Sequence, residues 1–356
     1  MPHRVRAAFE STLINLAALI GALAVSMLLI ALSGADPAEA IRALWDGAFS
    51  GRAQIAGTLF KMIPLLLVAL GWIVAYSARR VSIGFEGQIL IGGVFGTWVG
   101  VTLSLPAGLH LALAVVAGVV GGALWVGIAA WLWARRNVNE IISTLLLNLI
   151  AIEIVSWLVR GPLQEVSGTF PRSKPILETA RWPLLLSRSA LTTDFLLALV
   201  MVLVIGFVMR RTTFGYQLRF TGANEEAARH GGIHTIRVNV LALIASGALA
   251  GLAGASLILG GESRSMSDNF SANYGFEGIV VALLARNNPY ATVPAALLFA
   301  ALRQGRGLME ARVGVPSSIV LITQGLVILL IAGVSFALER RQIARVDTVS
   351  EPGDEA

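Results

Sequence analysis

The sequence predicts an all-α polytopic membrane protein with about ten transmembrane elements, arranged as an inverted 5+5 repeat with broken helices. Three observations predict this class: the composition, a series of apolar blocks of membrane-spanning length, and a short motif that occurs twice. Of the 356 residues, 56% are hydrophobic and 13% are charged, whereas an ordinary globular domain is about a quarter charged. A soluble fold would therefore have too little polar surface.

The apolar blocks are close to the ~20 residues that a helix needs to cross ~30 Å of hydrocarbon. The first block is too long for the core of a signal peptide, and many more follow it, so we expect it to be retained. The expected segments are residues 13–33, 57–77, 85–105, 109–134, 139–158, 194–209, 236–258, a divided stretch 276–303, and 316–337.

Four pairs of arginines set the expected orientation. They are Arg79-Arg80, Arg135-Arg136, Arg210-Arg211 and Arg340-Arg341. The first three pairs follow the second, fourth and sixth segments, so they share a face with Arg4 and Arg6, and the positive-inside rule assigns that face to the cytoplasm. The last pair lies on the same face only if the divided stretch crosses the membrane an even number of times. The net charge of +6 thus reflects orientation, and we expect no nucleic-acid partner.

The divided stretch is interrupted by "ARNNPY" (Ala285–Tyr290). Pro289 disfavours helix at the residue before it and lacks a backbone donor. The flanking pieces, Phe276–Ala285 and Ala291–Leu302, are each too short to cross lipid alone, and such pieces persist when other helices shield them. We therefore expect ten elements with both termini inside. Eight spans plus a re-entrant hairpin would also place both termini inside.

The tetrapeptide "GFEG" occurs at Gly84–Gly87 and again at Gly275–Gly278. The first copy opens the third element and the second copy opens the eighth, so the two copies have opposite orientations. This is the pattern of an inverted repeat whose broken helices meet near the midplane. We expect one transmembrane domain over residues 1–356, with repeat halves at about 13–158 and 194–337.

Each motif places a glutamate, Glu86 or Glu277, in the first turn of a helix. There a carboxylate can accept unpaired N–H groups and meets the positive end of the helix dipole. Capping is the more common role, and the alternative is that these helix starts border a translocation pathway, since ionisable groups inside a membrane often mark such paths. The candidate pathway residues are Ser82, Gly84, Glu86, Gln88, Glu140, Thr144, Asn148, Asn273 and Glu277.

The fifth segment carries Glu140, Thr144 and Asn148 at intervals of four, so the three side chains share one face. A polar stripe on a spanning helix faces a watery path or forms hydrogen bonds to other helices. Both roles stay open, and the pathway role is our working hypothesis. Close helix packing is predicted by the spacings Gly92-Gly96-Gly100, Gly118-Gly122 and Gly247-Gly251.

Local sequence signals predict the structure of two segments on the outer side. Asp36 as N-cap with Pro37 after it predicts a helix start. The apolar face of this helix predicts that it lies flat on the membrane surface; that face consists of Ile41, Leu44, Trp45 and Ala48. Residues 159–193 contain four prolines and mixed charges, which predicts a structured outer loop and a docking surface.

The inner segment, residues 213–235, contains a short helix with clear start and stop signals. Asn224 can cap it, two glutamates occupy its first turn, Arg229 lies in its last turn, and Gly231-Gly232 ends it. An exposed helix of this kind does not help to build the bundle, so it is a candidate contact for a cytoplasmic partner; the alternative is a simple connector. Residues 338–356 are expected to form a cytoplasmic tail.

The sequence gives little support for a catalytic site or a metal-binding site. The chain has no cysteine, which excludes thiol chemistry, and its scattered histidines do not form a metal-binding pattern. A Walker A loop needs a lysine before serine or threonine, but the two lysines, Lys61 and Lys174, precede Met62 and Pro175. We therefore expect no enzymatic site and no cofactor.

Four stretches, "IGFEGQILIGG", "NVNEIISTLLLNLIA", "TGANEEAARHGGI" and "GFEGIVVALLARNNP", together resemble the permease subunits of bacterial ABC importers. They are most similar to the branch that carries nucleosides and related simple-sugar compounds, next to the ribose and branched-chain amino acid permeases. The resemblance covers residues 57–337. The family typically has asparagine where Ser82 stands, and often Leu-Gly where Tyr290-Ala291 stands.

The resemblance implies a type II-like permease fold in the bacterial cytoplasmic (inner) membrane. It also implies that Thr221–Ile233 contains a coupling helix seated in a separate cytoplasmic ATPase subunit. A second, related permease chain and an extracytoplasmic solute-binding protein are the other implied partners. The residues implied in coupling are Gly222, Asn224, Glu225, Glu226, Ala228, Arg229, Gly231 and Gly232. A secondary transporter driven by an ion gradient is the alternative, because inverted repeats and membrane carboxylates also fit it.

Overall fold

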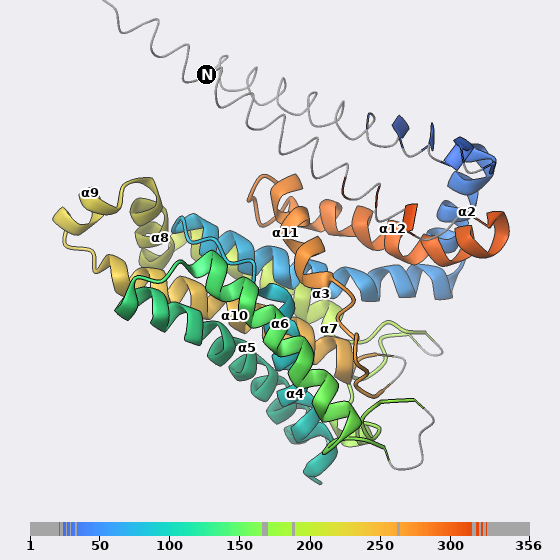
Figure 1. Cartoon of the computed structure of the whole chain (residues 1–356), viewed down its shortest axis with the longest axis horizontal. Coiled ribbons are helices and arrows are strands. Elements are labelled where there is room, and N and C mark those ends of the chain that lie inside the picture. Colours follow the sequence, from blue (N-terminus) through green and yellow to red (C-terminus); the bar gives the residue numbers. More distant parts are fainter. Residues whose placement is uncertain are drawn as a thin grey trace, which may run out of the picture. The chain divides into compact units, whose positions relative to one another are not determined.

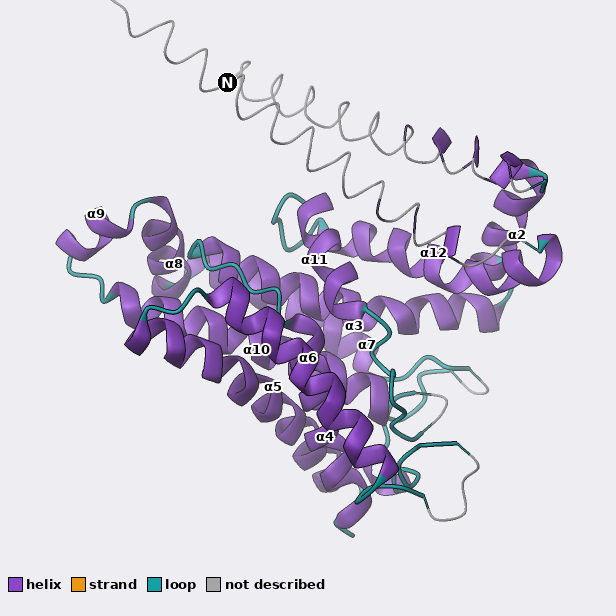
Figure 2. Ribbon diagram, in the orientation of Figure 1, coloured by secondary structure: helices purple, strands orange, loops and turns teal. Residues whose placement is uncertain are grey.

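The structure is a computed structural model that describes residues 34–165, 170–186, 189–261 and 264–314, with isolated positions between 21 and 32 and between 318 and 325. The described chain is helical, and only isolated β-bridges join its loops (Figures 1 and 2). Most of the predicted segments 13–33 and 316–337 lies outside the described residues, as do Arg4, Arg6, Arg340 and Arg341 and the tail.

The helices follow the predicted order. They are α2 (Pro37–Phe49), α3 (Arg52–Ser77), α4 (Phe85–Thr102), α5 (Leu109–Arg136), α6 (Glu140–Arg160), α7 (Asp194–Arg211), α8 (Thr213–Ala223), α9 (Glu225–His230), α10 (Thr235–Leu259), α11 (Tyr274–Leu284) and α12 (Thr292–Val313). Among the described residues, α3, α5, α6 and α10 are long and apolar enough to cross a membrane, and α7 with α8, bent by 68°, makes a fifth if counted as one span. The ten elements and the inverted repeat stay predictions.

The predicted break within 276–303 is confirmed. Helix α11 ends at Leu284 and α12 begins at Thr292, and between them Arg286 and Asn287 have left-handed backbone conformations, with φ of 52° and 54°. The second piece is longer than predicted, since α12 continues to Val313. The residues after Leu302 include arginines, glutamine and glutamate, but most of them are good helix formers, so the helix does not end where the apolar run ends.

The chain forms two compact units, one of residues 1–48 with 302–356 and one of residues 49–301. In the first unit, α2 packs on the C-terminal part of α12 through small residues. A Cβ on Gly47 would lie 2.9 Å from the Gly305 Cα, and Ala40, Ala43 and Met309 are buried in this contact.

The predicted start of α2 is confirmed, because the Asp36 carboxylate accepts the Ala38 N–H at 2.8 Å. That α2 lies flat on the membrane surface stays a prediction. Ile41 and Trp45 are exposed, but Ala48 is buried. The small side chains of α2 allow a close approach to a neighbouring helix, and the bulky ones are left on the outside.

In the second unit, α3 and α10 are buried at the centre, whereas α5 and α6 expose apolar outer faces. The predicted glycine packing is confirmed where α4, α5 and α10 cross. Gly251 faces Gly92 on one side and Gly122 on the other, and in each pair a Cβ would collide with the backbone opposite. The helices therefore approach to backbone contact, as small-residue spacings allow.

The two ends of this unit differ. The arginine pair that follows α3 and the pairs that end α5 and α7 lie at the end that carries α8 and α9 (Figure 1). Loops occupy the other end, where Ser173 and Ile176 donate backbone N–H groups to the Met266 and Arg264 carbonyls at 2.8 Å. The predicted outer loop is thus structured, and its described part contains one 3₁₀ turn, Glu178–Ala180, but no spanning helix.

Candidate functional site

The site begins at the connector between α3 and α4, residues 78–84. Helix α3 ends in a turn in which Arg79 has a left-handed backbone (φ 57°) and the Arg80 N–H donates to the Ala75 carbonyl at 3.1 Å. Gly84 is the N-cap of α4 and supplies no side-chain cap. The chain therefore passes from one buried helix to the next through an irregular segment that other elements must hold.

Helix α6 holds this connector through its polar stripe. The Ile83 N–H donates to the Thr144 hydroxyl at 3.2 Å, and the Asn148 amide donates to the Ile83 carbonyl at 2.9 Å. The Asn148 carbonyl oxygen accepts the Gly87 N–H at 2.8 Å. Both side chains are buried, so the stripe forms interhelical hydrogen bonds here, and its pathway role stays a prediction.

Glu86 caps the helix that begins at the other copy of its motif. We expected it to cap α4, but its two carboxylate oxygens accept the Asn273 N–H at 3.0 Å and the Gly275 N–H at 2.8 Å at the start of α11. Gly275 also leaves no room for a Cβ against the Glu86 backbone, so the two GFEG copies are in contact. Glu277 is buried in the first turn of α11.

Ser82 completes this region from the connector. Its hydroxyl accepts the Gln88 amide at 3.2 Å and the Gly84 N–H at 3.4 Å. The candidate pathway residues that are buried are Ser82, Gly84, Glu86, Gln88, Thr144, Asn148 and Glu277, whereas Glu140 is partly buried and Asn273 is exposed. The structure thus gathers most of the candidates where the starts of α4 and α11 meet α6.

The inner segment has the predicted caps. Helix α8 ends at Ala223, and the Asn224 side chain accepts the Ala227 N–H at 2.9 Å at the start of α9. The two glutamates occupy the first turn, Gly231 is the C-cap, and Gly232 has φ of 82°. Helix α9 is largely exposed, with Ala228 as its buried residue.

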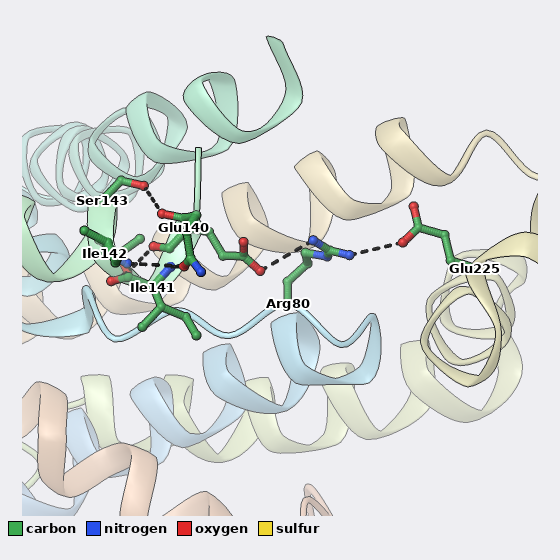
Figure 3. Close-up of polar contacts among 8 residues, drawn as sticks. Arg80, Glu140, Ile141, Ile142, Ser143 and Glu225 are labelled. Atoms are coloured by element: carbon green, nitrogen blue, oxygen red, sulfur yellow. Dashed lines mark hydrogen bonds and ion pairs between the residues drawn. The ribbon is translucent and has the colours of Figure 1, made fainter. Parts of the chain in front are cut away.

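Two contacts tie this inner segment to the end of α3. Gly222 packs so closely on the Ser77 carbonyl that a Cβ would not fit. Arg80 reaches Glu225 on α9 at 3.2 Å and Glu140 on α6 at 3.5 Å (Figure 3). Sequence reasoning assigned Arg80 to orientation only. Its position directly before the connector was the local signal, but nothing in the sequence pattern pointed to its partners.

The break between α11 and α12 also has partners that the sequence did not indicate. The Trp72 indole N–H donates to the Asn287 side-chain oxygen at 3.1 Å. The Tyr290 ring lies against Gly206 on α7, with the Arg210 guanidinium 4.8 Å from the ring centroid. The break is therefore held from α3 and from α7.

These features define a class of protein: a helical membrane protein in which the starts of two helices, α4 and α11, meet at a repeated motif, with a capped helix protruding at the end rich in arginine. The model of one family, described as the branched-chain amino acid transport system / permease component, matches residues 54–332. The chain belongs to this family and is a transport permease.

Three relatives match most of the chain. The glucose ABC transporter permease protein of Haloferax volcanii is 36% identical over 87% of this chain and 84% of its own length. The guanosine ABC transporter permease protein of Bacillus subtilis is 33% identical over 92% and 94%. The nucleoside ABC transporter permease protein of Lactococcus lactis subsp. cremoris is 29% identical over 93% of each chain.

Proposed function

We propose that this permease subunit imports nucleosides, or related solutes that contain a sugar, by alternating access, and that a separate subunit hydrolyses the ATP. The observation that carries the proposal is helix α9, which is exposed, capped at both ends and tied through Glu225 to Arg80. A simple connector needs neither the caps nor the tie, whereas a surface that transmits force from another subunit needs both.

The choice of nucleosides rests on two relatives that match more than nine-tenths of this chain and are named for guanosine and nucleosides. Another relative is named for glucose, a compound that has a hydroxylated sugar ring, as nucleosides do. Hydroxyl and amide side chains such as Ser82, Gln88 and Asn148 suit such rings, because they both donate and accept hydrogen bonds. The proposed pathway residues are Ser82, Gly84, Glu86, Gln88, Glu140, Thr144, Asn148, Asn273 and Glu277.

The proposed assembly has three partners. A cytoplasmic ATPase subunit binds the coupling segment, a second and related permease chain completes the pathway, and an extracytoplasmic solute-binding protein docks on the outer loop at residues 159–193. The absence of a Walker A lysine from the sequence supports a separate ATPase. We place the assembly in the bacterial cytoplasmic membrane with both termini inside, an orientation supported by the arginine pairs.

The test is uptake by the whole assembly. The permease is reconstituted in proteoliposomes with its ATPase subunit, its partner permease and its binding protein, and uptake of radiolabelled guanosine is measured. We expect uptake that requires ATP and that excess adenosine or uridine reduces, while excess glucose does not. Reduction by glucose alone would contradict the nucleoside assignment.

The same vesicles separate this proposal from a secondary transporter. Without ATP, an imposed proton or sodium gradient should drive no guanosine uptake. Uptake under a gradient alone would contradict ATP coupling and support the secondary transporter, which has no need of a protruding helix at residues 225–230.

A further inference from the structure

We infer that Arg80 is a positioning residue for transport: it links the protruding helix α9 to the connector at residues 78–84 and transmits movement of α9 to the place where the two GFEG motifs meet. This inference rests on the proposed function and deepens it. It concerns a residue that lies outside both the coupling helix and the proposed pathway.

Three elements converge on the Arg80 side chain, and Figure 3 shows its contacts with two of them, α6 and α9. Its two terminal nitrogens lie 3.5 Å from Glu140 at the start of α6 and 3.2 Å from Glu225 at the start of α9. Its guanidinium carbon lies 4.4 Å from the ring centroid of Trp133 near the end of α5. An arginine suits this position because its planar fork can serve two carboxylates at once and stack on an aromatic face.

The environment makes these contacts more than a surface pairing. Only 15% of the Arg80 side chain is exposed, with 13% of that of Glu140 and 35% of that of Glu225, so water and salt screen the pair with Glu140 less than an exposed pair and the pair with Glu225 to an intermediate degree. The backbone also fixes the position, since the Arg80 N–H is bonded to the end of α3. The side chain thus connects three elements from a fixed point.

Helix α9 depends on this link. Among the ion pairs between described residues that involve α9, Arg80–Glu225 joins it to another element, whereas Arg229–Glu225, at 4.0 Å, lies within the helix. Gly222 anchors the preceding helix by packing alone. Among the described residues, Arg80 is therefore the residue outside α9 that forms an ion pair with this helix.

From Arg80 the contacts continue to the motifs without a gap. Helix α6, which begins at Glu140, holds the connector at Ile83 and the first motif at Gly87 through Thr144 and Asn148. The first motif then caps the second through Glu86. Packed and hydrogen-bonded groups of this kind carry coupling between distant sites, and the coupling is established by measuring it directly.

The test uses the reconstituted assembly with three measurements: co-purification of the ATPase subunit, guanosine imported per ATP hydrolysed (as inorganic phosphate released), and maleimide labelling of Phe276→Cys. The chain has no cysteine of its own, and Phe276 lies in the second motif with 39% of its surface exposed. Labelling therefore reports on the motif with and without ATP and vanadate.

For Arg80→Gln we expect the ATPase subunit to co-purify as it does with the wild type. The guanosine-to-ATP ratio should fall by about tenfold or more, which is within the usual range of coupling between sites. The change in labelling that ATP and vanadate cause should disappear. Arg80→Lys should restore part of the ratio, because it keeps the charge but loses the fork. Arg79→Gln is the matched control, since Arg79 is exposed and has no ion pair with a described residue; it should behave as the wild type does.

A double-mutant cycle tests the link itself. Glu225→Gln should lower the ratio in the wild-type background and add nothing in the Arg80→Gln background, since residues that act through one contact are not additive. A wild-type ratio and labelling change in Arg80→Gln would overturn the inference. If Arg80→Gln does not fold, a wild-type result for Glu225→Gln overturns it equally.

The two proposals fail in different ways. Wild-type vesicles that import no guanosine with ATP contradict the proposed cargo or energy source. The labelling change with ATP and vanadate needs no cargo, so its loss in Arg80→Gln still supports the positioning role, and its persistence still overturns it.

Discussion

At the scale of residues, buried polar side chains are used to hold backbone groups that the breaks leave unpaired. The Glu86 carboxylate accepts two N–H groups at the start of α11, where a helix has unpaired donors and a positive dipole end. Asn148 pairs one carbonyl and one N–H beside the start of α4. Irregular backbone survives inside a membrane protein only where such partners exist.

The first prediction concerns Glu86→Gln. The amide keeps one acceptor oxygen but presents its NH₂ group to the second backbone donor, so at least one charge-assisted bond is lost, at a cost of about 1.5–3 kcal/mol. We expect a lower thermal midpoint of the purified permease and slower guanosine uptake. Glu153→Gln is the control, because Glu153 is an exposed glutamate on α6; an equal loss there would show that the effect is not due to the cap.

The second prediction concerns Asn148→Leu. Leucine leaves the Gly87 N–H and the Ile83 carbonyl without their partner, and each buried unpaired group costs about 1–3 kcal/mol. We expect lower thermal stability together with a changed KM or maximal rate of uptake across guanosine, adenosine and uridine. Unchanged transport kinetics for all three would leave Asn148 with a packing role and remove it from the pathway.

At the scale of elements, the helices fall into two kinds. Helices α4, α5 and α10 cross at glycines and approach to backbone contact, which suits a rigid body. Helix α9 is short, exposed and attached at its first residue, which suits a lever. A substitution at the crossing of α4, α5 and α10 should therefore impair folding, whereas a substitution in α9 should impair coupling.

The third prediction tests the lever. Glu226→Arg reverses a charge on an exposed first-turn position, and Gly231→Trp adds bulk at the end of α9, where a Cβ would have only ordinary contacts of 3.4 Å. Both variants should insert normally and lose nearly all uptake, because a partner surface no longer fits. Glu39→Arg, on the exposed first turn of α2, should transport normally. Normal uptake by both α9 variants would remove the coupling assignment.

The fourth prediction tests the rigid crossing. In Gly251→Ala the methyl group would lie 3.0 Å from the Gly122 Cα and closer still to the Gly118 carbonyl. Overpacking of this kind costs about 1–3 kcal/mol, so the yield of monodisperse protein in gel filtration and the thermal midpoint should both fall. Gly127→Ala, on α5 with open space around it, should be neutral or stabilising, and an equal loss there would contradict the packing argument.

At the scale of the whole molecule, the arrangement requires that the coupling segment and the outer loop face opposite sides of the membrane. The fifth prediction follows from this. Single cysteines at His230 and Lys174, both exposed, should react with a membrane-impermeant maleimide from the inside and from the outside, respectively. Labelling of both from one side would contradict the orientation and with it the assignment of α9.

The sequence predicted much of this arrangement, and the limits of the prediction have a physical reason. Helices between residues 57 and 258, the break near Pro289 and the Asn224 cap all follow from patterns a few residues long, such as apolar blocks, proline and capping residues. The partners of Glu86 and Arg80 could not be predicted, because Asn273 lies 187 residues from Glu86 and Glu225 lies 145 residues from Arg80. No local pattern records which distant groups will meet.

The wide separation of Glu86 from the N–H groups that it holds also has a consequence for biosynthesis. A ribosome adds roughly 5–20 residues per second, so about 10 to 40 s pass between translation of this carboxylate and translation of Asn273, 187 residues later. During that interval α4 must enter the bilayer with a carboxyl group that has not yet met the backbone N–H groups it holds in the folded protein. Final assembly of the bundle is therefore a late event that awaits the last third of the nascent chain.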